Sequence, residues 1–221
     1  MNHLRARLYS AVRSDSGMSL VEVVVAIAIL AVLSTASLGV YLSSTSVALE
    51  QQRRHVAITI ANESMEIISG WSTSTVAATG VSALFTARSK VKVNALWAKN
   101  NAEGVVNATY PMWDPTAVPT ATAAFPDAVP LSRDVTKSGT RFTAETLIGF
   151  CVQRISGGSC VKLTTSYNPT LIPAPAVPAG YTQLARAIVI VRWTAGCPAG
   201  GCVYTTSTLI DLTSDLEWKI T

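Results

Sequence analysis

Hydrophobic residues form one long run near the start of the chain. No charged residue occurs between Val23 and Leu49, and positions 23–42 are predominantly apolar. At about 1.5 Å of rise per residue, twenty helical residues extend about 30 Å, which is the thickness of the hydrocarbon core of a bilayer. The pattern therefore predicts a membrane-spanning helix over about 23–42, with one carboxylate, Glu22, at its start.

A different pattern follows from Glu50 to Trp71. Small and apolar residues recur at spacings of three and four, and charged residues occupy the opposite side, as in an amphipathic helix. Gly70 is a suitable helix stop. We expect a single helix from Met18 to about Ser69, its first part in lipid and its second part packed on a head. The expected packing face consists of Ala57, Ile60, Ala61, Ser64, Met65, Ile68 and Trp71.

The sequence from 71 to 138 is rich in Ala, Ser, Thr and Pro and has weak periodicity. We expect mostly irregular structure there, with one possible strand at Ser89–Trp97, where polar and apolar residues alternate. Tyr110, Met112 and Trp113 offer either an exposed contact surface or a loop pinned to the core. The pinned loop is the expected outcome, because aromatic residues between prolines more often pack inward.

The last third of the chain, 139–221, is rich in Val, Ile, Thr and aromatic residues, which favour strands. Gly-rich segments divide it into two expected hairpins, and the Pro-rich stretch Asn168–Gly180 is the expected crossover between them. One face of such a sheet needs an apolar partner, which the amphipathic helix supplies. This predicts an α+β fold with an antiparallel sheet of about four strands. The strand candidates are Arg141–Ile155, Cys160–Ser166, Leu184–Thr194 and Val203–Leu212.

Charge is concentrated at the N-terminus. The chain of 221 residues has a formal net charge of +4, and residues 1–17 contain three arginines and one aspartate. The remainder is close to +2, which is too small for a nucleic-acid-binding footprint. Basic residues before an apolar helix stay on the cytoplasmic side, so the head after about Leu49 is expected outside the membrane.

Gly17, Met18, Ser19, Leu20, Val21 and Glu22 form a motif between the basic segment and the apolar run. This arrangement resembles the processing motif of type IV prepilins and pseudopilins, in which a basic leader ends in Gly and the mature chain has Glu at its fifth position. The family usually has Phe at the first mature position, where this chain has Met18. The strand Leu184–Thr194 and the Thr-rich strand after it also resemble the C-terminal sheet of minor pilins and pseudopilins.

The resemblance implies a role for each residue of the motif. A membrane-embedded prepilin peptidase would cut between Gly17 and Met18 and methylate the new amine of Met18. Glu22 would neutralise the N-terminus of a neighbouring subunit as helices pack into a filament, since two charges that are costly in an apolar medium become tolerable when paired. Gly39 would be a helix weak point where many pilins have Pro, although Gly is also common in spanning helices for close packing.

The expected organisation is that of a pilin-like ladle. Residues 1–17 are the leader peptide, 18–70 the long helix, 71–138 the irregular part of the head and 139–221 its antiparallel sheet. An ordinary signal peptide has a shorter apolar region and no acid at its entrance. A plain single-pass anchor would explain the length of the run but not the spacing from Gly17 to Glu22.

All four cysteines lie in the part expected to be exported, where disulfides persist. Pairing Cys151 with Cys160 and Cys197 with Cys202 would close each expected hairpin near its turn, although four cysteines allow three pairings. A zinc site is the alternative, and only Cys197 and Cys202 have suitable spacing for it.

Catalysis is not expected from this sequence. After the leader the chain has a single histidine, His55, which lies beside Arg53 and Arg54 on the helix, where no pocket is expected. No phosphate-binding loop is present, because the segment ISGGSC has neither the Lys nor the following helix of such motifs. Asp211, Asp215 and Glu217 could form a calcium site but are more simply a solvated tail. We expect no enzyme, cofactor or metal.

The sequence favours a minor pilin-like structural subunit of a type IV pilus or a related filament. Its expected partners are a prepilin peptidase, other pilin-like subunits and the membrane, with a single pass through the cytoplasmic membrane before assembly into a surface filament. A pseudopilin of a type II secretion or DNA-uptake machine is the alternative within this class. A membrane-anchored binding module that never assembles is the alternative from another class.

Overall fold

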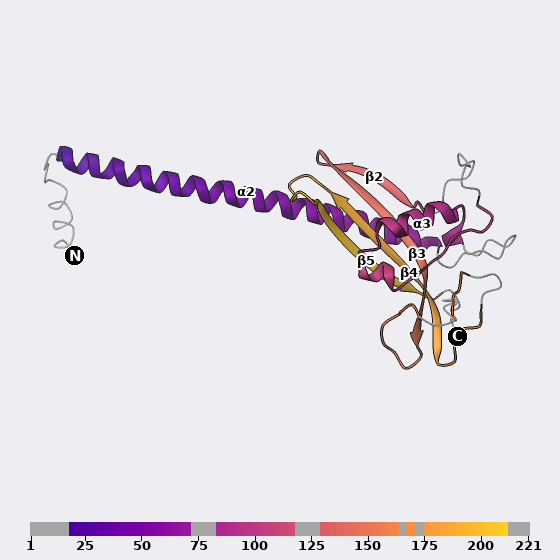
Figure 1. The fold of residues 1–221 in the computed structure, drawn as a ribbon. Helices are drawn as coiled ribbons and strands as arrows, with labels where there is room; N and C mark the ends of the chain where they lie inside the picture. Colours follow the sequence, from indigo (N-terminus) through magenta and orange to yellow (C-terminus); the bar gives the residue numbers. More distant parts are fainter. Residues whose placement is uncertain (1–17, 72–82, 118–128, 164–166, 171–174, 212–221) are drawn as a thin grey trace, which may run out of the picture. The chain divides into compact units, whose positions relative to one another are not determined.

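The computed structural model describes residues 18–71, 83–117, 129–163, 167–170 and 175–211 (Figure 1). The chain divides into two compact units, Met1–Gln51 and Gln52–Thr221. Helix α2, Leu20–Trp71, belongs to both units, and it confirms the prediction of one long N-terminal helix. The remaining described elements, including an antiparallel sheet, form the head within the second unit.

The described residues of the head form five strands in one antiparallel sheet (Figure 1). Strand β3 is central because it pairs with β4 along one edge and with β1 and β2 along the other. Strand β5 pairs with the far edge of β4. The α+β arrangement is as predicted, with five strands where about four were expected. The strands are β1 Tyr110–Pro111, β2 Ser132–Lys137, β3 Thr140–Arg154, β4 Tyr181–Trp193 and β5 Cys202–Ile210.

One face of the sheet packs against the second half of α2. Ala57, Ile60, Ala61, Ser64 and Ile68 are buried on the helix, as the spacing predicted. The chief core cluster joins the apolar members of this face to alternate residues of β3 and β4, among them Phe142, Ile148, Val189 and Trp193. Met65 packs at the margin of this cluster, whereas Trp71 is 43% exposed, so its assignment to the packing face was wrong.

The opposite face of the sheet is covered by two short helices, α3 at Lys90–Lys99 and α4 at Gly104–Asn107. Leu147, Ile188 and Ile190 of the sheet pack with Val106 of α4 and with Leu96 and Trp97 of α3. Residues of β3 and β4 therefore alternate between the two faces, and both strands are buried on both sides over most of their length.

The predicted strand at Ser89–Trp97 was wrong, because this segment forms α3 after Ser89. Lys and Val alternate over its first four residues, which is the polar and apolar pattern of a strand. Val93, Leu96 and Trp97 have the three- and four-residue spacing of a helix face. Val93 is buried and Leu96 and Trp97 pack with the sheet, while Val91 is 61% exposed. Tertiary packing on β3 and β4 selects the helix.

The predicted pairing of β3 with a strand at Cys160–Ser166 was also wrong for its described residues. Only Val161 forms a bridge there, with Val152, while residues 164–166 lie outside the described residues. Instead, β2 and β1 occupy that edge of β3, so the region expected to be irregular supplies two strands. Strands β3 and β4 pair directly over twelve positions, so Asn168–Gly180 connects neighbouring strands and is not a crossover between two hairpins.

A carboxylate fixes the loop before α3. Asp114 accepts hydrogen bonds from the backbone nitrogen of Ala87, at 3.0 Å, and from the backbone and hydroxyl of Thr116. Burial alone would raise the pKa of Asp114. These hydrogen bonds, together with one from the Ala117 backbone, have the larger effect and lower the pKa below its ordinary value. Asp114 thereby helps to place Tyr110 and Trp113, which are buried and half-buried, so the loop is pinned and not an exposed contact surface.

Both disulfides have the pairing that the sequence predicted. The sulfur atoms of Cys151 and Cys160 are 2.12 Å apart, and those of Cys197 and Cys202 are 2.03 Å apart. Cys151 lies in β3 and Cys202 begins β5, so each bond ties a strand to an adjoining loop. Because each sulfur is bonded to another cysteine, Cys197 and Cys202 do not offer thiolates to a zinc ion.

Gly149 is expected to be intolerant of any side chain. A Cβ atom at this position of β3 would lie 2.0 Å from the carbonyl oxygen of Tyr110 in β1. The backbone of β1 would have to move, so we expect Gly149→Ala to lower the free energy of unfolding by about 1 to 3 kcal/mol. Denaturant unfolding of the full chain in detergent measures this change. Gly104→Ala is the control, because no atom lies within 4 Å of its Cβ position, and an equal loss in both variants would contradict the prediction.

Candidate membrane and assembly site

The N-terminal end of α2 holds Glu22, and Met18 lies just before it. The backbone nitrogens of Glu22 and Val23 donate to the carbonyl oxygen of Ser19 at 2.9 and 3.2 Å, so the first helical turn forms around Ser19. Glu22 lies within this turn, where the positive end of the helix dipole favours a carboxylate. Met18 precedes the helix and its side chain is 71% exposed. Gly17 lies outside the described residues.

The first part of α2 exposes an apolar surface on every side. All residues from Met18 to Glu50 are exposed except the half-buried Thr45. Large apolar side chains such as Leu20, Val32 and Val40 are 79%, 67% and 71% exposed. A monomeric soluble protein rarely exposes a contiguous apolar patch of this size. The helix is long and apolar enough to cross a membrane, by its length and composition.

Four hydroxyl groups of this segment form hydrogen bonds within the helix. Thr35, Ser37, Thr45 and Ser46 each donate to a backbone carbonyl three or four residues earlier. These internal bonds lower the cost of placing hydroxyl groups in lipid. Apart from the phenol of Tyr41, Glu22 is the only ionisable side chain between Met18 and Glu50.

Helix α2 is continuous through Gly39. No atom lies within 4 Å of the position that a Cβ would take there, so the described residues impose no steric requirement for glycine. The role of Gly39 as a helix weak point remains a prediction.

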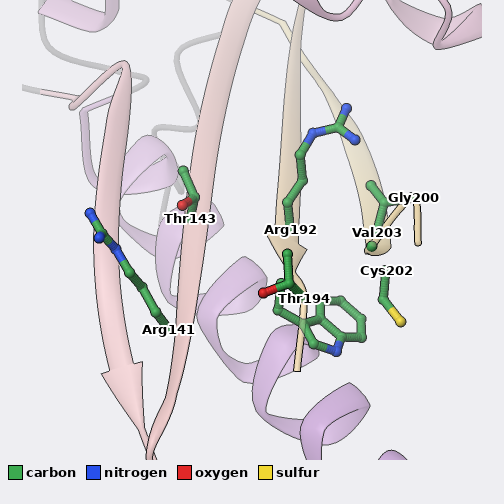
Figure 2. Close-up of a pocket in the computed structure, with 9 residues that line it drawn as sticks. Arg141, Thr143, Arg192, Thr194, Gly200, Cys202 and Val203 are labelled. Carbon is green, nitrogen blue, oxygen red and sulfur yellow. The ribbon is translucent and has the colours of Figure 1, made fainter. Parts of the chain in front are cut away.

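The head contains a pocket of about 330 Å³ where the β3–β4 ladder ends (Figure 2). The last pair of that ladder is Thr143 with Arg192, beyond which β3 continues beside β2 and β4 continues beside β5. The guanidinium of Arg141 pairs with Asp134 at 2.5 Å, and that of Arg192 donates to Asn100 at 2.8 Å. The two cations thus already have partners on the protein. The pocket is lined by Arg141, Thr143, Arg192, Trp193, Thr194, Gly200, Gly201, Cys202 and Val203.

A buried carboxylate, which nothing in the sequence pattern marked, ties α3 to the sheet. Glu145 of β3 is 2% exposed, accepts a hydrogen bond from Asn100 at 3.1 Å and forms an ion pair with Lys99. Arg192 lies 3.7 Å from the same carboxylate. Such a charge is stable when buried only with partners, which identifies the cluster as structural. Among the described residues, no group of three or more His, Cys, Asp or Glu side chains is placed to hold a metal ion.

Comparison with family models finds one match, to the prokaryotic N-terminal methylation motif, over residues 12–38. The matched range contains Gly17, Met18 and Glu22 and extends to the middle of the apolar segment. The chain carries the prepilin signature of the type IV pilin family. No curated protein and no solved structure matches the chain significantly.

The prepilin signature supports a membrane environment for the exposed apolar helix. It supports a type IV pilin-like or pseudopilin substrate of a prepilin peptidase, and it implies assembly with other pilins in a membrane. The apolar helix and the signature together fit a single-pass membrane anchor with an extracellular head. The signature also suggests a structural subunit and not an enzyme.

Proposed function

We propose that this protein is a minor pilin-like structural subunit of a type IV pilus or related surface filament. It is cleaved between Gly17 and Met18, methylated on the amine of Met18 and assembled through α2. The observation that carries the proposal is the prepilin signature at residues 12–38 in register with Glu22, at the start of an exposed apolar helix. Neither a plain anchor nor a signal peptide accounts for that combination.

Glu22 has the electrostatic role in this proposal. An acid costs roughly 2.5 to 3.5 kcal/mol at the centre of a spanning helix, and less near its end. An unpaired ammonium in an apolar medium carries a similar penalty. When helices pack, the carboxylate of Glu22 and the N-terminal ammonium of a neighbouring subunit neutralise each other, so assembly removes two penalties at once.

The apolar surface of the first part of α2 serves in two environments. Lipid covers it while the subunit resides in the membrane, and the helices of other subunits cover it in the filament. Lipid chains are as apolar as these side chains, so transfer between the two environments leaves the hydrophobic free energy almost unchanged. The free energies of the Glu22 ion pair and of close helix packing then determine the direction of the transfer.

Processing of the native protein tests the proposal. The mature chain is expected to begin at Met18 with one added methyl group, and intact-mass measurement with N-terminal sequencing checks both features. Gly17→Val is expected to leave the leader attached, because the bulky side chain blocks the peptidase. Gly39→Val introduces the same side chain within α2, away from the cleavage junction, and is expected to leave processing unchanged.

Two results would contradict the proposal. An unprocessed chain in the native host would favour a membrane-anchored module that does not assemble. A mature chain that begins near Ser34–Ser37, where small residues cluster, would indicate an ordinary signal peptide.

A further inference from the structure

The apolar segment of α2 has charges at both ends, and the two ends match. In the proposed function Met18 carries the amine of the mature chain, and Glu22 lies four residues after it. At the other end Glu50 is the first charged residue after the segment, and Arg54 lies four residues after Glu50. Met18 and Glu50 are 32 positions apart, as are Glu22 and Arg54. An offset of four residues between two parallel copies of α2 therefore places opposite charges side by side at both ends.

Both pairs of charges lie on one side of the helix. A separation of 32 residues is about 8.9 turns at 3.6 residues per turn, so residues at that separation lie within about 40° of each other around the axis. Steps of three and four residues connect Glu22 to Glu50 and then to Arg54, which is the spacing of a seam between two packed helices. The intervening residues of this seam are Val25, Ile29, Val32, Ala36, Gly39, Ser43 and Val47.

The seam is exposed along its whole apolar part and forms a groove in its second half. None of its residues between Glu22 and Glu50 is buried or half-buried. Small residues in the groove allow the backbones of two helices to approach closely, which favours helix association in a membrane. The groove is lined by Gly39, Val40, Ser43, Ser44, Val47, Ala48 and Gln51.

Glu50 and Arg54 are available to a partner helix. Both side chains are exposed, and neither forms an ion pair with another described residue. The adjacent Arg53 is half-buried, and its guanidinium lies against Gly196 of the head. Arg54 is therefore the arginine that is free to face a neighbouring subunit.

We propose that the α2 helices of neighbouring copies of this chain pack in parallel along the seam with an offset of four residues, and that Glu50 of one copy pairs with Arg54 of the next. The inference rests on the proposed function, because the pairing of Met18 with Glu22 sets the same offset at the other end. Both copies keep the same direction across the membrane. The contact is heterologous, so each copy offers Glu50 to one neighbour and Arg54 to another, and the contact can repeat along a filament.

The charges select this offset against others. Four residues correspond to about 6 Å along the axis, and two identical copies have the same offset at both ends of the segment. With no offset, like charges would lie side by side at both ends, which is unfavourable. A pilin of another sequence would need the same charges at the same spacing, whereas a second copy of this chain has them. The Glu50–Arg54 pair remains exposed to solvent, so its loss changes incorporation by no more than about twofold and acts chiefly on the register.

Disulfide cross-linking of the full-length protein in sheared filaments tests the offset. Two chains are produced together, one with Ser43→Cys and the other with Val47→Cys. In the proposed register the two cysteines lie at the same level of the seam, where helices about 8 to 10 Å apart bring facing Cα atoms within the range of a disulfide. A cross-linked dimer is expected on a non-reducing gel. Either variant produced alone is the control, because its two copies are offset along the axis, at a Cα separation of about 7 to 8 Å that disfavours the bond.

A charge reversal in one of the two chains tests the ion pair. Glu50→Arg in the Ser43→Cys chain is expected to lower cross-linking about two- to fivefold, because the new arginine would lie beside Arg54 of the Val47→Cys chain. Adding Arg54→Glu to the Val47→Cys chain is expected to restore cross-linking. Glu50→Arg in the Val47→Cys chain is the matched control, because that position lies outside the cross-linked contact, and no loss is expected. Peptide mapping that finds both native disulfides intact excludes disulfide exchange.

Equal cross-linking by the single variants and by the mixture would overturn the proposal, since the helices would then have no offset. Absence of cross-linking in filaments that contain both chains would overturn it as well. Equal effects of Glu50→Arg in the two chains would show that the ion pair does not form. These results leave the proposed function intact, because the amount of subunit in filaments is measured separately. Absence of the unmodified chain from filaments would contradict the proposed function and this inference with it.

Discussion

Replacing Glu22 by glutamine is expected to abolish incorporation of the subunit into filaments while processing and membrane insertion continue. The amide keeps the shape of the side chain but removes the charge that, in the proposed function, neutralises an incoming N-terminal ammonium. An uncompensated charge in an apolar environment costs about 3 to 5 kcal/mol. At about 1.4 kcal/mol for each factor of ten, the loss is at least a hundredfold in incorporation. The amount of subunit in sheared filament fractions, relative to the amount in membranes, measures the effect.

Glu50→Gln is the matched control for this prediction. Glu50 also lies on α2 and is exposed, but it follows the uncharged segment and is not at the helix start. Its substitution is expected to leave incorporation within about twofold of wild type, since exposed charges contribute little. Wild-type levels of the Glu22→Gln subunit in filaments would show that Glu22 has no docking role, and the plain membrane anchor would then be favoured.

Substitution of Ile60 by alanine is expected to cause the largest loss of head stability, about 2 to 5 kcal/mol. Ile60 is 1% exposed and lies in the core cluster between α2 and the sheet, where a cavity cannot be filled by small side-chain movements. The midpoint of denaturant unfolding of the full-length chain in detergent, followed by tryptophan fluorescence, measures the loss. Trp193, which is 6% exposed in the same cluster, reports on this part of the core.

Ile58→Ala on the same helix provides the comparison. Ile58 is only half-buried and lies outside the core cluster, so the same change is expected to cost less than about 1.5 kcal/mol. Equal destabilisation by the two variants would show that α2 does not pack on the head through the face described here. Both substitutions lie about 35 residues beyond Glu22, so neither is expected to alter processing.

The long helix was predictable because its two patterns are local. A charge-free apolar run and an amphipathic period of 3.6 residues depend only on neighbours along one element, and both occur between Leu20 and Ile68. Strands β3, β4 and β5 were predictable for a similar reason, since Val, Ile, Thr and aromatic residues are concentrated in them. The short cysteine spacings likewise favoured the two disulfides that the structure contains.

The pairing of the strands was not predictable in the same way. Register between distant segments depends on which edge another segment has already occupied, and a single sequence does not record that competition. Three of the six residues of strand β2 are charged, so its composition does not indicate a strand. It nevertheless pairs with β3 over its whole length. Two of these charges form ion pairs in the fold, Arg133 with Glu63 of α2 and Asp134 with Arg141 of β3.

The sequence by itself determined the long apolar helix, the prepilin signature and most of the helix face that the head buries. Each of these features depends only on the spacing of residues that are close together in the chain. Only the tertiary structure decided that Lys90–Lys99 is a helix, that Glu145 is buried beneath it and that β5 is the end of the described sheet. Those features arise from contacts between residues far apart in the chain. The free energy of such contacts depends on the complete packing arrangement, so local preference does not fix them.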